Sequence, residues 1–170
     1  MRKITVLTVV LAILVLIFPS CVKNNDPLFY EKGKINAEIV MRMNGTVLRA
    51  EISLSEPHEE RERDATVRFM EPKSVSGLTV TRKNGTVEAT LGGTVMKDLD
   101  CTPLLYVTEL FSTGGSVTLA EVAELDGEKV TELNVTNGEE VYTVFVTSDG
   151  LPRRIVSGEM TVDIVWIECE

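Results

Sequence analysis

The chain has 170 residues, a length that suggests one domain or one domain plus a tail. Its 44% hydrophobic and 25% charged residues are an ordinary globular mixture, which argues against a disordered or collagen-like chain. The 26 acidic residues outnumber the 17 basic ones, and the formal net charge of -9 disfavours nucleic-acid binding, which depends on neutralising phosphates.

The first twenty residues are expected to be a secretory signal. Arg2 and Lys3 precede the run Ile4 to Phe18, in which only two threonines are polar. A basic start followed by an apolar run of this length is typical of an export signal. The run is shorter than the about 20 apolar residues of a membrane span. It also lacks the amphipathic period of a helix that packs on a core.

Cys21 follows this run and is the expected attachment point of a lipid. The segment Phe18-Pro19-Ser20-Cys21, with a small residue before the cysteine, resembles the lipobox of bacterial lipoproteins. In that family the cysteine becomes the first mature residue and its sulfur carries a diacylglycerol. Residues 21–33 would then be a tether. Its acyl chains (palmitate, for example), at about 0.8 kcal/mol per buried methylene, would hold the protein on the extracytoplasmic face of the cell membrane. Ordinary cleavage that leaves a free thiol, and an uncleaved anchor, are the alternatives.

The chain contains three cysteines, an odd number for an exported protein. If Cys21 carries lipid, Cys101 and Cys169 remain as a possible disulfide pair, which export would permit. Two buried free thiols are the alternative, and we favour it because the sequence gives no distance between the two residues.

Residues 34–170 are predicted to form one mainly β domain, a strongly curved antiparallel sheet with one or two short plug helices. Apolar and polar residues alternate in Ile35–Met43 and in Leu48–Leu54, so each strand has one dry face and one wet face. Toward the C-terminus, Ile164 and Trp166 are expected to share the dry face with Met160 and Val162. Five Asx-Gly pairs suit tight hairpin turns, whose central residues need positive φ: Asn44-Gly45, Asn84-Gly85, Asp126-Gly127, Asn137-Gly138 and Asp149-Gly150.

The segment from Thr102 to Phe111 breaks the strand pattern and predicts a short helix. Thr102 suits the N-cap, Pro103 suits the first helical position, and the glycines after Phe111 suit the end. Leu104, Val107 and Phe111 are expected to share one face. One short helix among many strands predicts a lid or plug on a curved sheet, with a two-layer sandwich as the alternative.

The sequence offers no catalytic or metal-binding constellation. The only histidine, His58, lies in the charged run Ser55–Asp64, which is typical of a solvated loop. A single histidine suits neither a nucleophile–base pair nor a paired metal site. There is no Gly-rich phosphate loop. We therefore expect no enzymatic activity, no metal and no cofactor.

Two segments carry a resemblance to a known superfamily. The strand Ala65–Pro72 ends at a proline and is followed by Ser74–Val80, which contains a Val-x-Gly-Leu element. Gly150–Ile155 carries a G-L-P-x-x-I step before the last strands. In these features the chain resembles the LolA/LolB-like superfamily of cell-envelope lipoprotein carriers, most closely its uncharacterised lipoproteins from Gram-positive-type bacteria. The resemblance implies an antiparallel half-barrel whose concave apolar face holds acyl chains.

We therefore expect a membrane-anchored, non-enzymatic envelope lipoprotein that binds lipid or lipoprotein acyl chains. A strongly curved sheet cannot fill its own concavity with short side chains, so it needs a plug or a ligand. One alternative is that the apolar residues simply pack under the helix. Another is that the fold serves as a protein-interaction or sensor module without a lipid. The residues expected to contact the ligand are Met41, Met43, Leu48, Ile52, Phe69, Leu78, Val80, Val87, Leu91, Leu104 and Val107.

Overall fold

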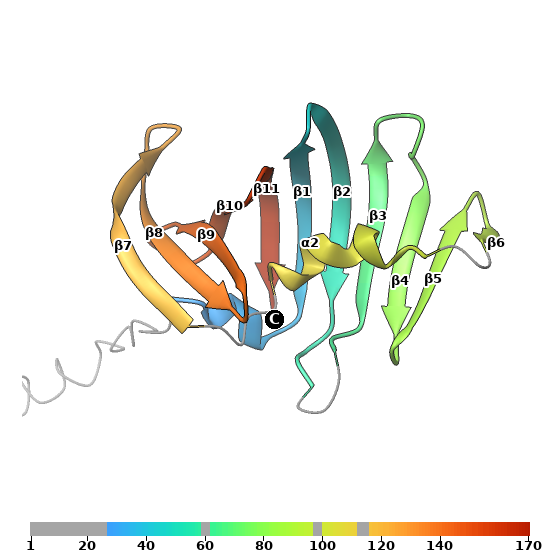
Figure 1. The fold of residues 1–170 in the computed structure, drawn as a ribbon, viewed down its shortest axis with the longest axis horizontal. Coiled ribbons are helices and arrows are strands. Elements are labelled where there is room, and N and C mark those ends of the chain that lie inside the picture. Colours follow the sequence, from blue (N-terminus) through green and yellow to red (C-terminus); the bar gives the residue numbers. More distant parts are fainter. Residues whose placement is uncertain (1–26, 59–61, 97–99, 112–115) are drawn as a thin grey trace, which may run out of the picture.

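The computed structural model describes residues 27–58, 62–96, 100–111 and 116–170, which form one open antiparallel sheet with short helical segments (Figure 1). The helical segments are η1 (Phe29–Lys32), a 3-10 turn, and the continuous pair η2 (Thr102–Leu105) and α2 (Tyr106–Glu109). The strands are β1 (Ile35–Met43), β2 (Thr46–Leu54), β3 (Ala65–Glu71), β4 (Leu78–Lys83), β5 (Thr86–Leu91), β6 (Thr94–Met96), β7 (Ser116–Leu125), β8 (Glu128–Asn137), β9 (Glu140–Val146), β10 (Pro152–Ser157) and β11 (Met160–Cys169).

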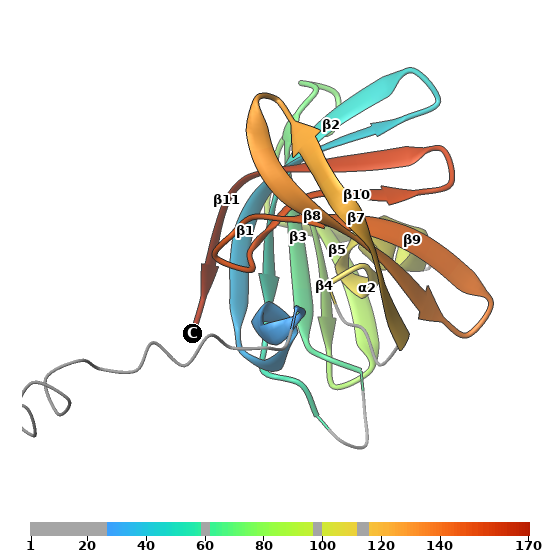
Figure 2. The ribbon, with the colours of Figure 1, turned by 90° about the vertical axis from the view of Figure 1, so that its left-hand side faces the viewer.

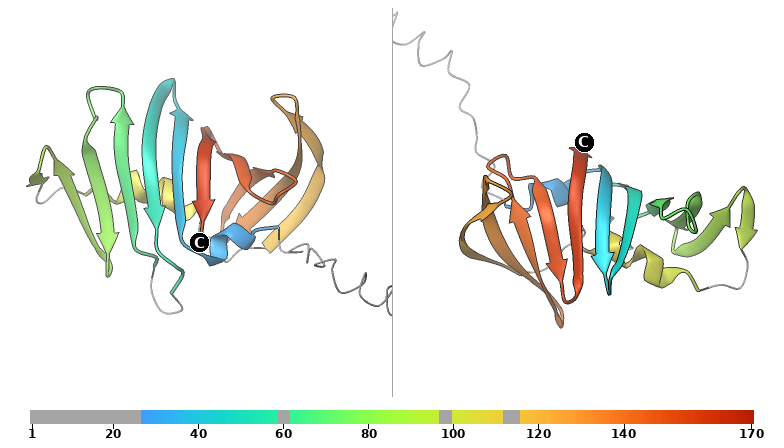
Figure 3. Two further views of the ribbon diagram at one scale, coloured as in Figure 1. Left: turned by 180° about the vertical axis from the view of Figure 1, so that it is seen from behind. Right: turned by 90° about the horizontal axis from the view of Figure 1, so that it is seen from above.

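The eleven strands follow the order β6-β5-β4-β3-β2-β1-β11-β10-β9-β8-β7. Every neighbouring pair is consecutive in the chain except β1 and β11, whose pairing joins the N-terminal and C-terminal halves. The sheet curls around the helical segment, most strongly at the β7–β10 end (Figures 2 and 3). The predicted curved antiparallel sheet with short helices is confirmed.

Three of the five predicted Asx-Gly turns have the backbone that their sequence predicts, whereas at Asn137-Gly138 and Asp149-Gly150 only the glycine has a positive φ. Asn44, Asn84 and Asp126 have φ values of 50, 52 and 53°, and the glycine after each also has positive φ. A left-handed residue followed by such a glycine is the geometry of a type I′ turn, which matches the twist of its two strands. These local turns explain why most sheet neighbours are also chain neighbours.

Strand β11 departs from the predicted alternation at Val165. The register between β1 and β11 shifts so that Glu38 lies opposite Trp166 and Ile39 lies opposite Ile164. Val165 is the extra residue of a β-bulge, and the bulge moves the following side chains to the other face. Trp166 is 44% exposed, and its Nε1 donates a hydrogen bond to Oε2 of Glu38 at 3.2 Å. The prediction that Trp166 shares the dry face with Ile164 is therefore wrong.

The hydrophobic core lies in the concavity of the sheet. The N-terminal segment contributes to it, because Leu28 and Tyr30 of the region predicted as a tether are 6% and 0% exposed. In the described ranges no helix has the length and apolar character that a membrane crossing requires. The largest fully buried side chains are Tyr30, Phe111, Ile35, Ile39, Ile52, Leu105, Leu110, Leu133 and Ile155.

Candidate functional site: the concave apolar face

Apolar side chains from five adjacent strands form a continuous row across the concave face. Ala37 of β1 lies opposite Ile52 of β2, Ile52 lies opposite Val67 of β3, and the row continues through Val80 of β4 to Ala89 of β5. Alternate residues of a strand point to the same face, so this register gathers the dry faces of the strands. All five side chains are at most 1% exposed.

The segment η2–α2 covers the middle of this face as a plug (Figures 1 and 2). It packs against β3 and β4, and the plug is taken to include the two residues that follow α2. Its side chains Leu105, Val107, Leu110 and Phe111 are at most 3% exposed. Val107 and Phe111 were expected on the covered face, whereas the predicted Leu104 is only half-buried. The first turn is a 3-10 turn with about three residues per turn, so the α-helical period does not describe this face.

The plug begins differently from the prediction. Thr102 lies inside the first 3-10 turn, and Cys101 occupies the N-cap position without a side-chain cap. The side chain of Asp100 instead accepts a hydrogen bond from the backbone N–H of Thr102 at 3.0 Å. The Thr102 cap prediction is therefore wrong, while Pro103 does lie in the first turn, where its missing N–H costs nothing.

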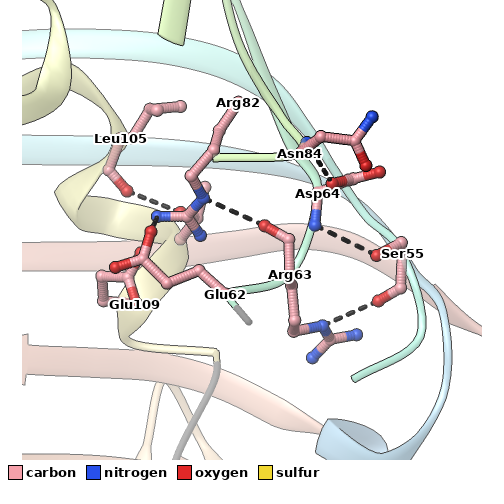
Figure 4. A network of polar contacts seen from close by, with 9 residues as sticks. Ser55, Glu62, Arg63, Asp64, Arg82, Asn84, Leu105 and Glu109 are labelled. Carbon is pink, nitrogen blue, oxygen red and sulfur yellow. Dashed lines mark hydrogen bonds and ion pairs between the residues drawn. The ribbon is translucent and has the colours of Figure 1, made fainter. Parts of the chain in front are cut away.

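A buried arginine attaches the plug to β4. Arg82 is 6% exposed and forms ion pairs with Glu109 at 2.6 Å and Glu62 at 2.9 Å (Figure 4). Its Nε also donates to the carbonyl oxygen of Arg63 at 3.0 Å. Alternate residues of a strand share a face, so Arg82 points to the same face of β4 as Val80. An arginine at a position where the alternation calls for an apolar residue was the signal that the sequence prediction missed.

Arg63 is a second buried cation, and it binds backbone carbonyls. Its guanidinium donates to the carbonyl oxygens of Ser55 at 2.7 Å, Glu31 at 3.2 Å, Phe111 at 3.4 Å and Gly33. The side chain thus joins η1, the end of β2 and the end of the plug. Burial lowers the pKa of the guanidinium, because loss of water penalises the charged form. At 5% exposure, Arg63 is the exception among the described residues of its charged run, in which Glu56, Pro57, His58 and Glu62 are exposed as predicted.

Cys101 and Cys169 are free thiols in the structure. Cys101 is 2% exposed and precedes η2, whereas Cys169 is half-buried at the end of β11, opposite Ile35. Burial raises the pKa of the Cys169 thiol. A raised pKa reduces the thiolate population and hence the reactivity of the sulfur.

The residues predicted to contact a ligand all come from the strands β1–β5 and the plug, but their exposure differs. Five members are buried, four in the sheet (Met41, Ile52, Phe69 and Val80) and one in the plug (Val107). The half-buried members pack against the core: Leu48, Leu78, Val87 and Leu104. Met43 and Leu91 are 48% and 44% exposed.

Four of these residues form a partly exposed apolar surface, the rim strip, defined as Met43, Leu48, Leu78 and Leu91. Met43 and Leu48 lie at the hairpin end of β1 and β2, and Leu78 lies opposite Leu91 in β4 and β5. These strand ends share the upper edge of the sheet in Figure 1, above the plug. Phe69 of β3 provides the buried floor between them. The centre of the concave face is therefore filled, and apolar side chains at this edge stay partly exposed.

A cleft of about 560 Å³ lies on the other side of the plug, beside Val87 and Leu105. Its lining includes Arg82 and the carboxylates of Glu62, Asp100 and Glu109. Because burying charged groups against hydrocarbon is costly, this cleft does not suit an acyl chain. The described residues contain no group of three or more His, Cys, Asp or Glu side chains that could hold a metal ion.

The predicted signal, residues 1–20, and the predicted lipidation site, Cys21, lie outside the described residues. His58, considered above as a metal ligand, is exposed on the segment that follows β2.

Comparison with known proteins shows that the fold of this chain is similar to that of several solved structures. No protein-family model and no curated protein sequence matches the chain. An uncharacterized conserved protein from Thermus thermophilus matches 85% of this chain and 84% of its own, with 14% identity and a TM-score of 0.53. MucB matches 88% of this chain with 12% identity and a TM-score of 0.50, and the match spans only 60% of the MucB chain. The Mycobacterium tuberculosis lipoprotein LppX matches 84% of this chain and 90% of its own, with 13% identity and a TM-score of 0.43.

Proposed function

We propose that this protein is a membrane-anchored, non-enzymatic lipoprotein of the bacterial cell envelope that holds an acyl chain on its rim strip. The observation that carries the proposal is the exposure of large apolar side chains on the concave face, with Met43 at 48% and Leu91 at 44%. Contiguous apolar surface that stays exposed marks a binding site more often than a structural one.

The composition of the rim strip fits a flexible hydrocarbon. Its side chains are aliphatic or thioether, and methionine adapts its shape to an irregular partner. The strip crosses from β1 to β5, which at about 4.8 Å between neighbouring strands is a width of about 19 Å. An extended fatty acyl chain of ordinary length matches that width.

The charge of the protein supports binding through the lipid tail. Removal of residues 1–20 would remove Arg2 and Lys3, so the net charge would change from -9 to -11. An acidic surface is repelled by anionic lipid headgroups, and membrane contact would therefore depend on the lipid at Cys21.

A paired substitution tests the rim strip. Met43 and Val47 belong to one hairpin and are 48% and 52% exposed, but they point to opposite faces of the sheet. Because burial of an apolar side chain contributes about 1.5–3 kcal/mol, Met43→Asp should lower the affinity for a fluorescent fatty acid about tenfold or more. Val47→Asp should leave the affinity almost unchanged. The affinities of both variants and of the parent are measured on residues 22–170, and native mass spectrometry detects any lipid that co-purifies with the protein. Equal losses in the two variants, or no uptake by the parent protein, would refute the proposal.

A second candidate function, a protein-interaction or sensor module, is favoured by the self-filled centre of the concave face. The plug side chains Leu105 and Phe111 are 1% and 0% exposed, so they pack into the centre of the concave face. MucB, which shares the fold, is found in crystals in complex with MucA(peri). Crosslinking in cells to one specific protein, with no lipid in the purified domain, would select this candidate over acyl-chain binding.

A further inference from the structure

A second cleft, of about 460 Å³, lies on the convex face, opposite the plug. It is formed where β1, β11 and β10 lie side by side (Figure 3, left) and where the tip of the β7–β8 hairpin approaches them. Its charged lining consists of Arg42, Asp126, Arg153, Arg154 and Asp163.

Two β-bulges build this cleft. The register between β9 and β10 shifts between Pro152 and Arg154, so Arg153 is an extra residue in β10. In an unbroken strand two consecutive arginines would point to opposite faces. The bulge changes the direction of one of the two side chains, and as a result Arg153 and Arg154 both line the cleft. The bulge in β11 acts similarly, since Ile164 and Val165 both line it.

The cleft carries an excess of positive charge. Asp163 lies between Arg42 and Arg154, with its Oδ1 2.5 Å from Nε of Arg154 and its Oδ2 in contact with Nη1 of Arg42. Arg154 also lies 3.6 Å from Asp126. Arg153 donates to the carbonyl oxygen of Ile164 at 3.1 Å, and among the described residues no carboxylate is in contact with it. Three guanidinium groups therefore face two carboxylates in a protein whose net charge is -9.

We propose that this convex cleft binds a phosphate group. Guanidinium N–H groups form a rigid fork that matches phosphate oxygens. Arg42 and Arg153 come from different strands and line the same cleft. In this proposal each of them donates to a different oxygen of one tetrahedral phosphate. A carboxylate ligand has only two oxygens, which lie in one plane and match a single guanidinium group, so a site with several arginines suits phosphate better. The site is separate from the rim strip, and the proposal does not depend on acyl-chain binding.

The only tryptophan of the chain, Trp166, follows Val165 of the cleft and reports on binding. Its fluorescence is followed while inorganic phosphate is added to the full chain in an uncharged detergent, with chloride used to keep the ionic strength constant. We expect a saturable change. Arg153→Gln should weaken phosphate binding about tenfold or more, because a charge-assisted hydrogen bond is lost. Asp163→Asn should strengthen it, because a competing carboxylate is removed.

Arg68→Gln is the matched control. Arg68 lies on the same convex face, pairs with Glu51 at 3.4 Å and does not line the cleft. Its substitution should change the affinity by no more than about twofold, as expected for an exposed pair. A thermal melt confirms that each variant is folded. No saturable response to inorganic phosphate, glycerol phosphate or phosphatidylglycerol, or equal affinity in Arg153→Gln and the parent for the compound that binds, would overturn the proposal.

Two further arms distinguish the source of the phosphate. In one arm, glycerol phosphate replaces inorganic phosphate in the titration. In the other arm, phosphatidylglycerol is incorporated into the detergent micelles, and micelles that contain phosphatidylcholine are the comparison. A response to inorganic and glycerol phosphate identifies a soluble phosphate ligand. A response to phosphatidylglycerol that Arg153→Gln weakens, without a response to either soluble phosphate, identifies a lipid headgroup. Each of these results supports a phosphate site, whereas silence in all arms rejects it.

Discussion

Replacement of Arg63 by methionine should lower the free energy of unfolding more than the same replacement at an exposed arginine. The guanidinium of Arg63 donates to the carbonyl oxygens of four residues, Ser55, Glu31, Phe111 and Gly33. These residues belong to the end of β2, η1 and the plug. Methionine has a similar length but no donor, so the substitution would leave these buried acceptors without that partner.

The expected cost follows from these contacts. A buried polar group that loses its partner costs about 1–3 kcal/mol. Water can reach some of the four acceptors, since Ser55 is half-buried and Gly33 is near the surface. With two acceptors out of reach of water, the free energy of unfolding should fall by about 2–6 kcal/mol, a large part of the 5–15 kcal/mol that is usual for a domain. The melting temperature should fall by roughly 10 °C.

Urea unfolding of residues 22–170, followed by circular dichroism and by Trp166 fluorescence, measures this loss. Arg68→Met is the control, because the Arg68 side chain is 62% exposed and its pairing with Glu51 is at the surface. An exposed pair of this kind contributes about 0–1 kcal/mol. A loss of less than about 1 kcal/mol in Arg63→Met, or a loss equal to that of Arg68→Met, would refute the assigned role of Arg63.

Three further predictions concern ionisation and anchoring. Burial, with the nearby Glu31, raises the pKa of Tyr30 well above its ordinary value of 10.0. A raised pKa means that the folded state holds the proton, so stability is full below pH 10 and falls as pH rises beyond it. Urea unfolding at pH 9 and 11 should show this loss, and Tyr30→Phe should reduce it. Burial also raises the pKa of Cys169, so iodoacetamide should label the Cys169 thiol slowly in the native chain and fast in urea. Failure to label Cys101 and Cys169 even in urea would indicate a disulfide. Finally, Cys21→Ala should move the protein from membranes to the soluble fraction, and continued membrane association would contradict lipidation.

The features that could be predicted from the sequence are those fixed by neighbours in the chain. Asn44-Gly45, Asn84-Gly85 and Asp126-Gly127 specify their turns by backbone preference alone, and the strands beside them alternate as expected. The antiparallel sheet and its short plug follow from such local rules. The apolar composition of the concave face follows from the same alternation.

The features that were missed depend on distant contacts. Arg63 lies in a run of charged residues, and only the approach of η1 and the plug end makes it buried. Trp166 changes face because of a bulge whose register is set by β1, more than 120 residues away in the chain. The convex cleft combines two bulges with Arg42 and the β7–β8 turn. Nothing in the local sequence marks these juxtapositions.

The burial of the plug decides where an acyl chain would bind. Leu105, Val107, Leu110 and Phe111 are almost completely buried, and at about 1.5–3 kcal/mol each their exposure would cost about 6–12 kcal/mol. At about 0.8 kcal/mol per buried methylene, an acyl chain would need about 8 to 15 fully buried methylenes merely to offset that cost. On the rim strip the same chain gains contact without this loss.

Hydrogen exchange tests this reasoning directly. Addition of a fatty acid should leave the amide protection of Tyr106–Glu109 unchanged, because the plug stays in place. Protection at the strand ends that carry Met43 and Leu91 should increase, since the ligand covers those side chains. Loss of protection in α2 on ligand addition would show instead that the chain enters beneath the plug, and the free-energy argument for the rim strip would then be wrong.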